Sequence, residues 1–301
     1  MKKIFKVSLG ITGIALIACA GILAFNDIKE KKGFVFEQKA IPSTNNMIEN
    51  ALKGVEGLYI SSAGKKDVAE AYKDVTADAV PHTFVEQIPE DFIVTDGIDK
   101  TLFMKIMTAH LLRTNEKILR ERKVILLLEE KMNAKKEFTS EEKSFFDKMV
   151  KKYDVEHLND DRAKILELIQ RVDIIPVSLG VAVSIWATNW GQKNRKSPFF
   201  EHGWNKETKY VPIEFDDLSA ATDSFALQLN TRSQLVLLRA DRKRQRMFIN
   251  KITFGQSLIV NMRNYLHFIP TFIDQLDLIY ELGYIRELDN ACFKEGCFLT
   301  K

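Results

Sequence analysis

The sequence predicts a mostly α-helical protein, and three observations carry this prediction. Between 101 and 132, apolar side chains recur every seven residues in two adjacent columns, which makes one wide apolar stripe on a long helix. Thr139 and Glu142 have the spacing of a capping box, so a second helix begins there and ends near Tyr153. Pro176 suits the first turn of another helix, whose apolar residues follow at helical spacing: Leu179, Val183, Trp186 and Trp190.

The remaining segments complete this organisation. Helices are expected at about 162–171, 218–230, 255–267 and 270–288, and the loop-rich stretch 192–217 has room for one short hairpin. Residues 26–89 are polar with weak periodicity and are interpreted as a tether and irregular lead-in. We therefore divide the chain into an anchor or signal segment at 1–25, the tether at 26–89, a helical lead-in region at 90–172 and a C-terminal domain at 173–301.

The charge of the chain is nearly balanced. The 301 residues carry 44 basic and 41 acidic side chains, a net charge of +3, so there is no global field of the kind that marks a general nucleic-acid binder. No nucleic-acid partner is expected. One local basic run consists of Arg239, Arg242, Lys243, Arg244 and Arg246. We interpret it as a solvated helical face, with contact to an anionic polymer or a lipid headgroup as the alternative.

The first 25 residues indicate export. Three lysines precede the apolar run 7–25, which exceeds the roughly 7–15 residues of a cleavable signal core and approaches the roughly 20 that span a bilayer. Three alternatives stay open: an uncleaved membrane anchor through 7–25, a lipoprotein lipidated at Cys19 in "LIAC", and simple secretion. All three place the body of the chain outside the cytoplasm. The expected location is the bacterial cell envelope, periplasmic or otherwise extracytoplasmic, and the first two alternatives hold the chain at the inner membrane.

The other two cysteines, Cys292 and Cys297, could close a small disulfide loop in such an oxidising compartment. The five histidines are scattered, and no further metal ligand lies near these cysteines in the sequence. Neither a metal site nor a cofactor is predicted.

The segment "RVDIIPVSLGVAVSIWATNWG", 171–191, resembles a known family. It is similar to the start of the catalytic domain in the Bax-type proteins of glycoside hydrolase family 73, the peptidoglycan-cleaving N-acetylglucosaminidases that also include the flagellar muramidase. Their motif runs Pro-x-Ser-Leu, Ala, a few helical residues, then Glu-Ser-x-Trp-Gly. This chain supplies Pro176, Ser178, Leu179, Ala182, Trp190 and Gly191 in register. The segments 102–128 and 215–242 also resemble the family, so the similarity covers about two thirds of the chain.

This resemblance implies a lysozyme-like α+β domain with a cleft for glycan strands, whose general acid is the glutamate of Glu-Ser-x-Trp-Gly. In this chain Ala187 occupies that position, and Thr188 replaces the serine. Glycosidic cleavage needs a protonated carboxylic acid beside the leaving oxygen. Losing the general acid alone removes about 10² to 10⁴ in rate. Two family tyrosines are also replaced, by Phe225 and Leu235, and "SPFFEHGW" stands where the family has Asn-x-Phe-Gly.

Two carboxylates are weak candidates to replace the missing acid. Glu201 is the nearest downstream and is interpreted as a solvated loop residue. Glu214 lies near where family members place a second, assisting carboxylate. Glycan contact is predicted for three residues: Trp190, Trp204 and Asn230. Each has a structural alternative, since Trp190 could pack beneath the cleft, Trp204 could lie in a plain loop, and Asn230 could cap the preceding helix.

The residues therefore favour a cell-envelope pseudoenzyme with a glucosaminidase-like domain. Its expected partners are the glycan strands of peptidoglycan or an envelope protein. One alternative is an active peptidoglycan hydrolase, an endo-β-N-acetylglucosaminidase that uses a relocated carboxylate. A second alternative, which rests on the altered loop and the basic run, is an envelope scaffold that does not bind glycan.

Overall fold

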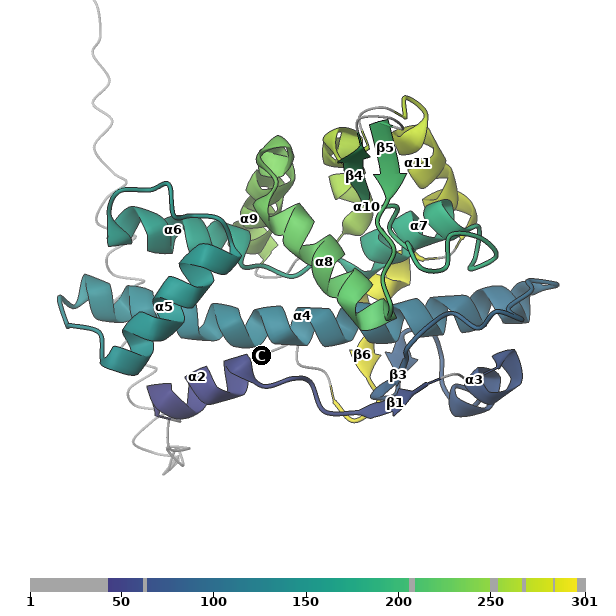
Figure 1. Ribbon diagram of the computed structural model, residues 1–301, viewed down its shortest axis with the longest axis horizontal. Helices are drawn as coiled ribbons and strands as arrows, with labels where there is room; N and C mark the ends of the chain where they lie inside the picture. The colour runs from purple at the N-terminus through teal and green to yellow at the C-terminus, as the bar shows by residue number, and fades with distance from the viewer. Residues whose placement is uncertain are drawn as a thin grey trace, which may run out of the picture. The chain divides into compact units, whose positions relative to one another are not determined.

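The computed structural model describes residues 43–61, 64–205, 209–249, 254–266, 269–283 and 285–296 (Figure 1). All of them belong to one compact unit, Ser43–Lys301. The apolar run 7–25 and Cys19 lie outside the described residues. Among the residues that are described, no helix combines the length and the apolar character that crossing a bilayer requires.

The prediction of a mostly helical protein is confirmed. In chain order the helices are α2 (Thr44–Leu52), α3 (Lys65–Ala71), α4 (Gly97–Asn133), α5 (Ser140–Lys152), α6 (Asp161–Arg171), α7 (Val177–Thr188), α8 (Leu218–Thr231), α9 (Val236–Ile249), α10 (Gly255–Leu258) and α11 (Phe272–Leu282). Short 3-10 turns are η1 (Ser233–Leu235), η2 (Ile259–Asn264) and η3 (Arg286–Asn290). The strands are β1 (Leu58–Ile60), β2 (Ala79–Val80), β3 (Thr83–Val85), β4 (His202–Asn205), β5 (Lys209–Pro212) and β6 (Cys292–Phe293).

The long helix α4 organises the unit. The Asp96 carboxylate caps its first turn by accepting hydrogen bonds from the backbone N–H groups of Ile98 and Asp99, at 2.8 and 3.1 Å. In Figure 1, α2 and the pair β1–β3 lie on one side of α4, and α7 and α8 lie on the other. Because partners cover α4 on more than one side, it needs the wide stripe that its two apolar columns provide.

Helix α5 begins as predicted. The Thr139 hydroxyl accepts from the Glu142 N–H at 3.3 Å, and the Glu142 carboxylate accepts from the Thr139 N–H at 2.9 Å. Tyr153 ends the helix.

The interpretation of 26–89 as an irregular tether is wrong for its described part. It contains α2 and α3, and β1 pairs in parallel with β3. Near the C-terminus β6 pairs in parallel with β2, where the Cys292 N–H donates to the Asp78 carbonyl at 2.9 Å. The boundary predicted between 172 and 173 also falls inside the compact unit, because α4 packs on α7 and α8.

Helix α7 is buried along nearly its whole length and is held at its start by the C-terminal segments. The Ser178 N–H donates to the Asp289 carboxylate at 2.9 Å, and the Ser178 and Tyr280 hydroxyls lie 2.7 Å apart. The Gly255 N–H donates to the same Asp289 carboxylate at 2.7 Å. The N-terminus of α10 therefore sits directly against that of α7.

Gly255→Ala is expected to lower the free energy of unfolding by about 1–3 kcal/mol, because a methyl group overpacks this contact. A Cβ at Gly255 would lie 2.3 Å from both the Ser178 and the Tyr280 hydroxyl oxygens and 2.9 Å from the Leu179 backbone nitrogen. Urea unfolding followed by circular dichroism measures the change. Gly54→Ala is the control, since a Cβ there meets no atom within 4 Å; equal losses in the two variants would contradict the prediction.

Candidate functional site

The end of α7 is a left-handed turn. Asn189, Trp190 and Gly191 have φ angles of 49°, 61° and 80°, and this region is uncommon for a bulky residue such as tryptophan. The Thr188 hydroxyl holds the turn, because it accepts from the Gly191 N–H at 2.8 Å and donates to the Ser184 carbonyl at 2.6 Å. Strained backbone of this kind concentrates at functional sites, which makes the end of α7 a candidate site.

Ala187 lies in the last turn of α7, where the resemblance places the general acid. Its side chain is buried, and its carbonyl accepts a hydrogen bond from the Asn194 side-chain amide at 2.9 Å. The Lys193 N–H donates to the Thr188 carbonyl at 2.9 Å. These two bonds fold the following loop back over the end of the helix, and position 187 itself has no group that can donate a proton.

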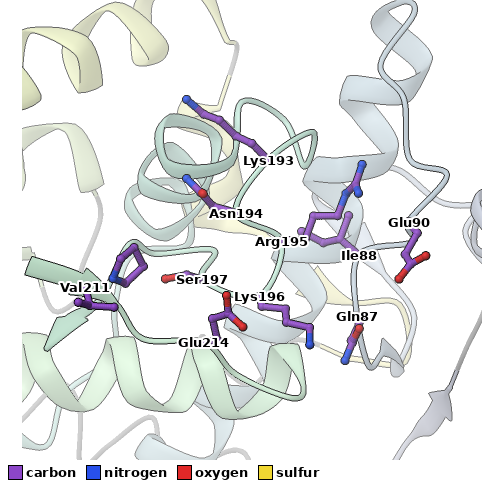
Figure 2. Close-up of a pocket in the computed structure, with 11 residues that line it drawn as sticks. Gln87, Ile88, Glu90, Lys193, Asn194, Arg195, Lys196, Ser197, Val211 and Glu214 are labelled. Atoms are coloured by element: carbon purple, nitrogen blue, oxygen red, sulfur yellow. The ribbon is translucent and has the colours of Figure 1, made fainter. Parts of the chain in front are cut away.

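A pocket of about 480 Å³ lies beside this loop (Figure 2). Residues 193–197 of the loop form one part of its lining. Residues between 87 and 90 and between 211 and 214 form the rest. The pocket therefore combines three segments that are far apart in the sequence.

Ser197 gives this pocket a buried polar atom. The side chain is 3% exposed, and its hydroxyl oxygen has no hydrogen-bond partner in the described part of the chain. Leaving such a group unsatisfied costs about 1–3 kcal/mol. In Figure 2 the Ser197 side chain lies in the same part of the pocket as Glu214 and Val211.

Charged side chains border the pocket, and their roles differ. Arg195 is held by the backbone, since its guanidinium donates to the Gly191 carbonyl at 2.7 Å and to the Phe92 carbonyl at 3.3 Å. Lys196 and Glu214 are exposed to solvent at the pocket. Glu214, a predicted candidate for the acid, therefore reaches the pocket but lacks the apolar enclosure that glycosidase acids use.

Glu201 is not the solvated loop residue that the sequence predicted. It is 1% exposed, the Ser224 hydroxyl donates to its Oε2 at 2.6 Å, and the Gln228 amide donates to the same oxygen. Burial raises the pKa of Glu201 to about 7, against smaller opposing effects of Ser224 and Arg232. This carboxyl therefore still holds a proton in much of the protein near neutral pH.

The hydrogen bonds from Ser224 and Gln228 both go to one oxygen of Glu201. Its Oε1 is buried and has no hydrogen-bond partner within the described residues. The nearby Tyr265 hydroxyl donates to the Phe199 carbonyl, at 2.9 Å. An ionised carboxylate would keep bare lone pairs on Oε1 in a dry site, which is costly. Because both oxygens are covered, Glu201 has no path to a glycosidic oxygen in this conformation.

Phe225 and Leu235, at the two positions where the resemblance implies tyrosines, pack in the core. The Phe225 ring stacks on Phe199, with centroids 4.2 Å apart and planes 6° apart, and meets the edge of Tyr265 at 5.6 Å. Leu235 is fully buried. Neither position reaches the pocket.

The three predicted glycan contacts have different outcomes. Trp190 is half-buried, its ring meets the edge of Phe103 at 6.2 Å, and the Lys100 ammonium lies 5.2 Å from its centroid. Asn230 is fully buried and donates to the Asp173 carbonyl at 3.1 Å, so it does not face a surface that a glycan could reach. Trp204 belongs to β4, and the placement of its side chain lies outside what the structure describes.

The basic run is only partly a solvated face, because Lys243 and Arg244 are exposed while other members point inward. Arg239 and Arg242 are buried, and the Arg242 guanidinium donates to the carbonyls of Asp173 and Ile174 at 3.2 and 3.1 Å. Arg246 Nε donates to the Asp173 carboxylate at 3.0 Å. Arg242 and Arg246 therefore fasten α9 to the segment before α7.

Cys292 is disulfide-bonded, and Cys297, its predicted partner, lies outside the described residues. Within the described ranges no group of three or more histidine, cysteine or carboxylate side chains is placed to hold a metal ion.

Comparisons with protein-family models, with curated proteins and with solved structures find no match for this chain. The resemblance therefore rests on the quoted motifs alone.

Proposed function

We propose that this chain is a cell-envelope protein with a lysozyme-like, glucosaminidase-type domain that does not hydrolyse glycan. It binds peptidoglycan glycan strands, or else an envelope protein, through the pocket beside the loop that follows α7. One observation carries the proposal: the buried Ala187 methyl stands where the resemblance places the acid, and Asn194, which covers the Ala187 carbonyl, also lines the pocket.

The chemistry of the pocket supports binding rather than cleavage. A glycosidase acid must hold a proton and reach the leaving oxygen. Glu214 reaches the pocket from an exposed position, and Glu201 holds a proton but is covered. By contrast, the exposed Lys196 ammonium is a hydrogen-bond donor suited to the hydroxyl and amide oxygens of an N-acetylated sugar.

The absence of hydrolysis is tested directly. The full-length chain, purified in detergent, is incubated with insoluble peptidoglycan, and new reducing ends are measured beside an active glucosaminidase. No release above the buffer background is expected. Release that grows with protein concentration would contradict the proposal.

Binding is tested by co-sedimentation with the same peptidoglycan at low salt. Lys196→Glu is expected to weaken binding about tenfold, the equivalent of roughly 1.4 kcal/mol, because it reverses a charge at the pocket. Lys148→Glu makes the same change on the exposed face of α5 and serves as the matched control. Equal binding by the two variants would place the glycan elsewhere, and no sedimentation of the unmodified chain would favour the scaffold alternative.

An active hydrolase that uses Glu201 is the second candidate, favoured by the raised pKa of about 7, which keeps a proton on this carboxyl near neutral pH. If this candidate holds, reducing ends appear, Glu201→Gln abolishes them and Glu214→Gln does not. The scaffold alternative keeps a smaller basic surface than the composition of the run predicts, because Arg239 and Arg242 are buried while Lys243 and Arg244 are exposed.

A further inference from the structure

Helix α9 has one face that no other described element covers. Its inward face packs against α6, α8 and α10 and carries the buried Leu238, Arg239 and Arg242. The outward face consists of the exposed residues at positions 236, 237, 240, 243, 244 and 247. At 3.6 residues per turn these six positions fall within about one third of the helix circumference. They therefore form a single stripe along the helix.

Large apolar side chains are exposed on the outward face of α9. Val236 is 55% exposed, Leu237 is 62% exposed and Met247 is 73% exposed. Apolar side chains that gather on one exposed face are typical of a surface that contacts a partner.

The outward face of α9 also carries positive charge. Lys243 and Arg244 are exposed and lie between the apolar positions, and no described carboxylate pairs with Lys243. Asp241 is the only acidic residue of α9. Arg244 lies 2.6 Å from one oxygen of its carboxylate, and the Asn261 amide donates to the other. The Arg244 side chain is still 69% exposed, against 25% for Asp241, so the cations dominate what this face presents to a partner.

We propose that the outward face of α9 docks on a bilayer surface that contains anionic phospholipids. Such a surface presents phosphates directly above acyl chains, which matches cations that alternate with apolar side chains. The apolar side chains enter the boundary between headgroups and acyl chains, and the two cations contact the phosphates. This inference goes beyond the proposed function and does not rest on it, because no residue of α9 lines the pocket.

Hydrogen exchange of the backbone amides tests this docking on the full-length chain in vesicles. The readout has to be local to α9, because the apolar run 7–25 can itself attach the chain to a vesicle. Two cations at an anionic surface favour the docked state by about 30-fold. In vesicles of phosphatidylglycerol mixed with phosphatidylcholine, the α9 amides are therefore expected to exchange up to about 30-fold more slowly than in phosphatidylcholine alone. High salt is expected to remove the difference.

The amides of α11 provide the internal control in the same measurement. This helix also exposes two leucines, Leu278 and Leu282, but it carries acidic residues and no basic one. Its exchange is expected to be the same in both kinds of vesicle. Slowing of α11 as large as that of α9 would mean that the vesicles act on the whole unit, which would overturn the proposal.

Reversal of the two charges tests which side chains are responsible. The double variant Lys243→Glu/Arg244→Glu is expected to lose the slowing of α9 exchange. Lys148→Glu/Lys151→Glu makes the same change on the exposed face of α5 and is expected to keep it. Equal α9 exchange of the unmodified chain in the two kinds of vesicle would overturn the proposal, and so would slowing that survives Lys243→Glu/Arg244→Glu.

Leu237→Ser/Met247→Ser gives an independent measurement if the charge variant does not fold. It keeps both cations and removes two of the apolar contacts, so a smaller slowing that still requires phosphatidylglycerol is expected. Full slowing in this variant would overturn insertion of the apolar side chains. Slowing of α9 without vesicles that grows with protein concentration would show that a second copy of the chain covers this face instead.

Discussion

Replacing Asp173 by alanine is expected to lower the free energy of unfolding by about 3–5 kcal/mol, the usual effect of leaving buried charges without their partner. The Asp173 carboxylate is 3% exposed. Arg246 donates to it at 3.0 Å, Arg122 lies 3.9 Å from it, and Arg242 donates to the Asp173 backbone carbonyl at 3.2 Å. Without the carboxylate, three guanidinium groups remain close together with less counter-charge. Urea unfolding followed by circular dichroism measures the loss.

Asp161→Ala is the matched control for this prediction. Its exposed carboxylate lies 3.1 Å from the Lys143 ammonium and 3.6 Å from the Lys164 ammonium, and exposed pairs of this kind contribute at most about 1 kcal/mol. A loss in Asp173→Ala no larger than in Asp161→Ala would show that the arginines are accommodated without Asp173. Asp173→Asn keeps the size of the side chain and should fall between the two.

The long helices could be predicted because their signals are local. The apolar columns of α4 and the capping box of α5 each lie within one element, so the sequence contains the whole pattern. The strands between 43 and 85 could not be predicted from the sequence, since β1, β2 and β3 span two or three residues each. Strands of that length are too short for an alternating pattern. Their partners lie elsewhere in the sequence, since β1 pairs with β3, β2 pairs with β6, and β2 and β3 also contact α4.

The inward position of part of the basic run follows from its helical spacing. Leu235, Leu238, Arg239 and Arg242 lie at spacings of three, one and three, which is the pattern of a single helical stripe, and all four are buried. Composition alone suggested a solvated face. The spacing to the neighbouring leucines indicates instead that Arg239 and Arg242 point inward.

The candidate site is harder to predict from the sequence than the long helices, because it depends on tertiary structure. The resemblance placed Ala187 on α7, but Asn194 and Ser197 carry no recognisable motif, and the pocket appears only where three distant segments meet. Glu201 was misjudged for the same reason. It stands in a polar, glycine-containing stretch, while the residues that bury it, Ser224 and Gln228, come more than twenty positions later.

Glu201→Gln is expected to stabilise the protein by up to about 3 kcal/mol above pH 7, which is the free energy of the pKa shift from 4.5 to about 7. The native pKa lies above the unfolded one, so between these values the native state binds the extra proton. The contribution of Glu201 to stability is therefore complete below about 4.5 and is lost as the pH rises through about 7. Glutamine is neutral at every pH, so its contribution to stability does not fall as the pH rises.

The pH profile of the unmodified chain alone would hide this effect. Burial lowers the pKa of His110 from 6.5 to about 4, while its Nε2 lies 2.9 Å from the Val85 carbonyl. His110 therefore contributes stability that is lost as the pH falls from 6.5 to 4, so its slope opposes that of Glu201 over most of the same range. Subtracting the stability of the unmodified chain from that of Glu201→Gln at each pH cancels His110. The difference is expected to rise from near zero at about pH 4 to its plateau above pH 7, and a flat difference would mean that Glu201 has the same pKa in the native and unfolded states.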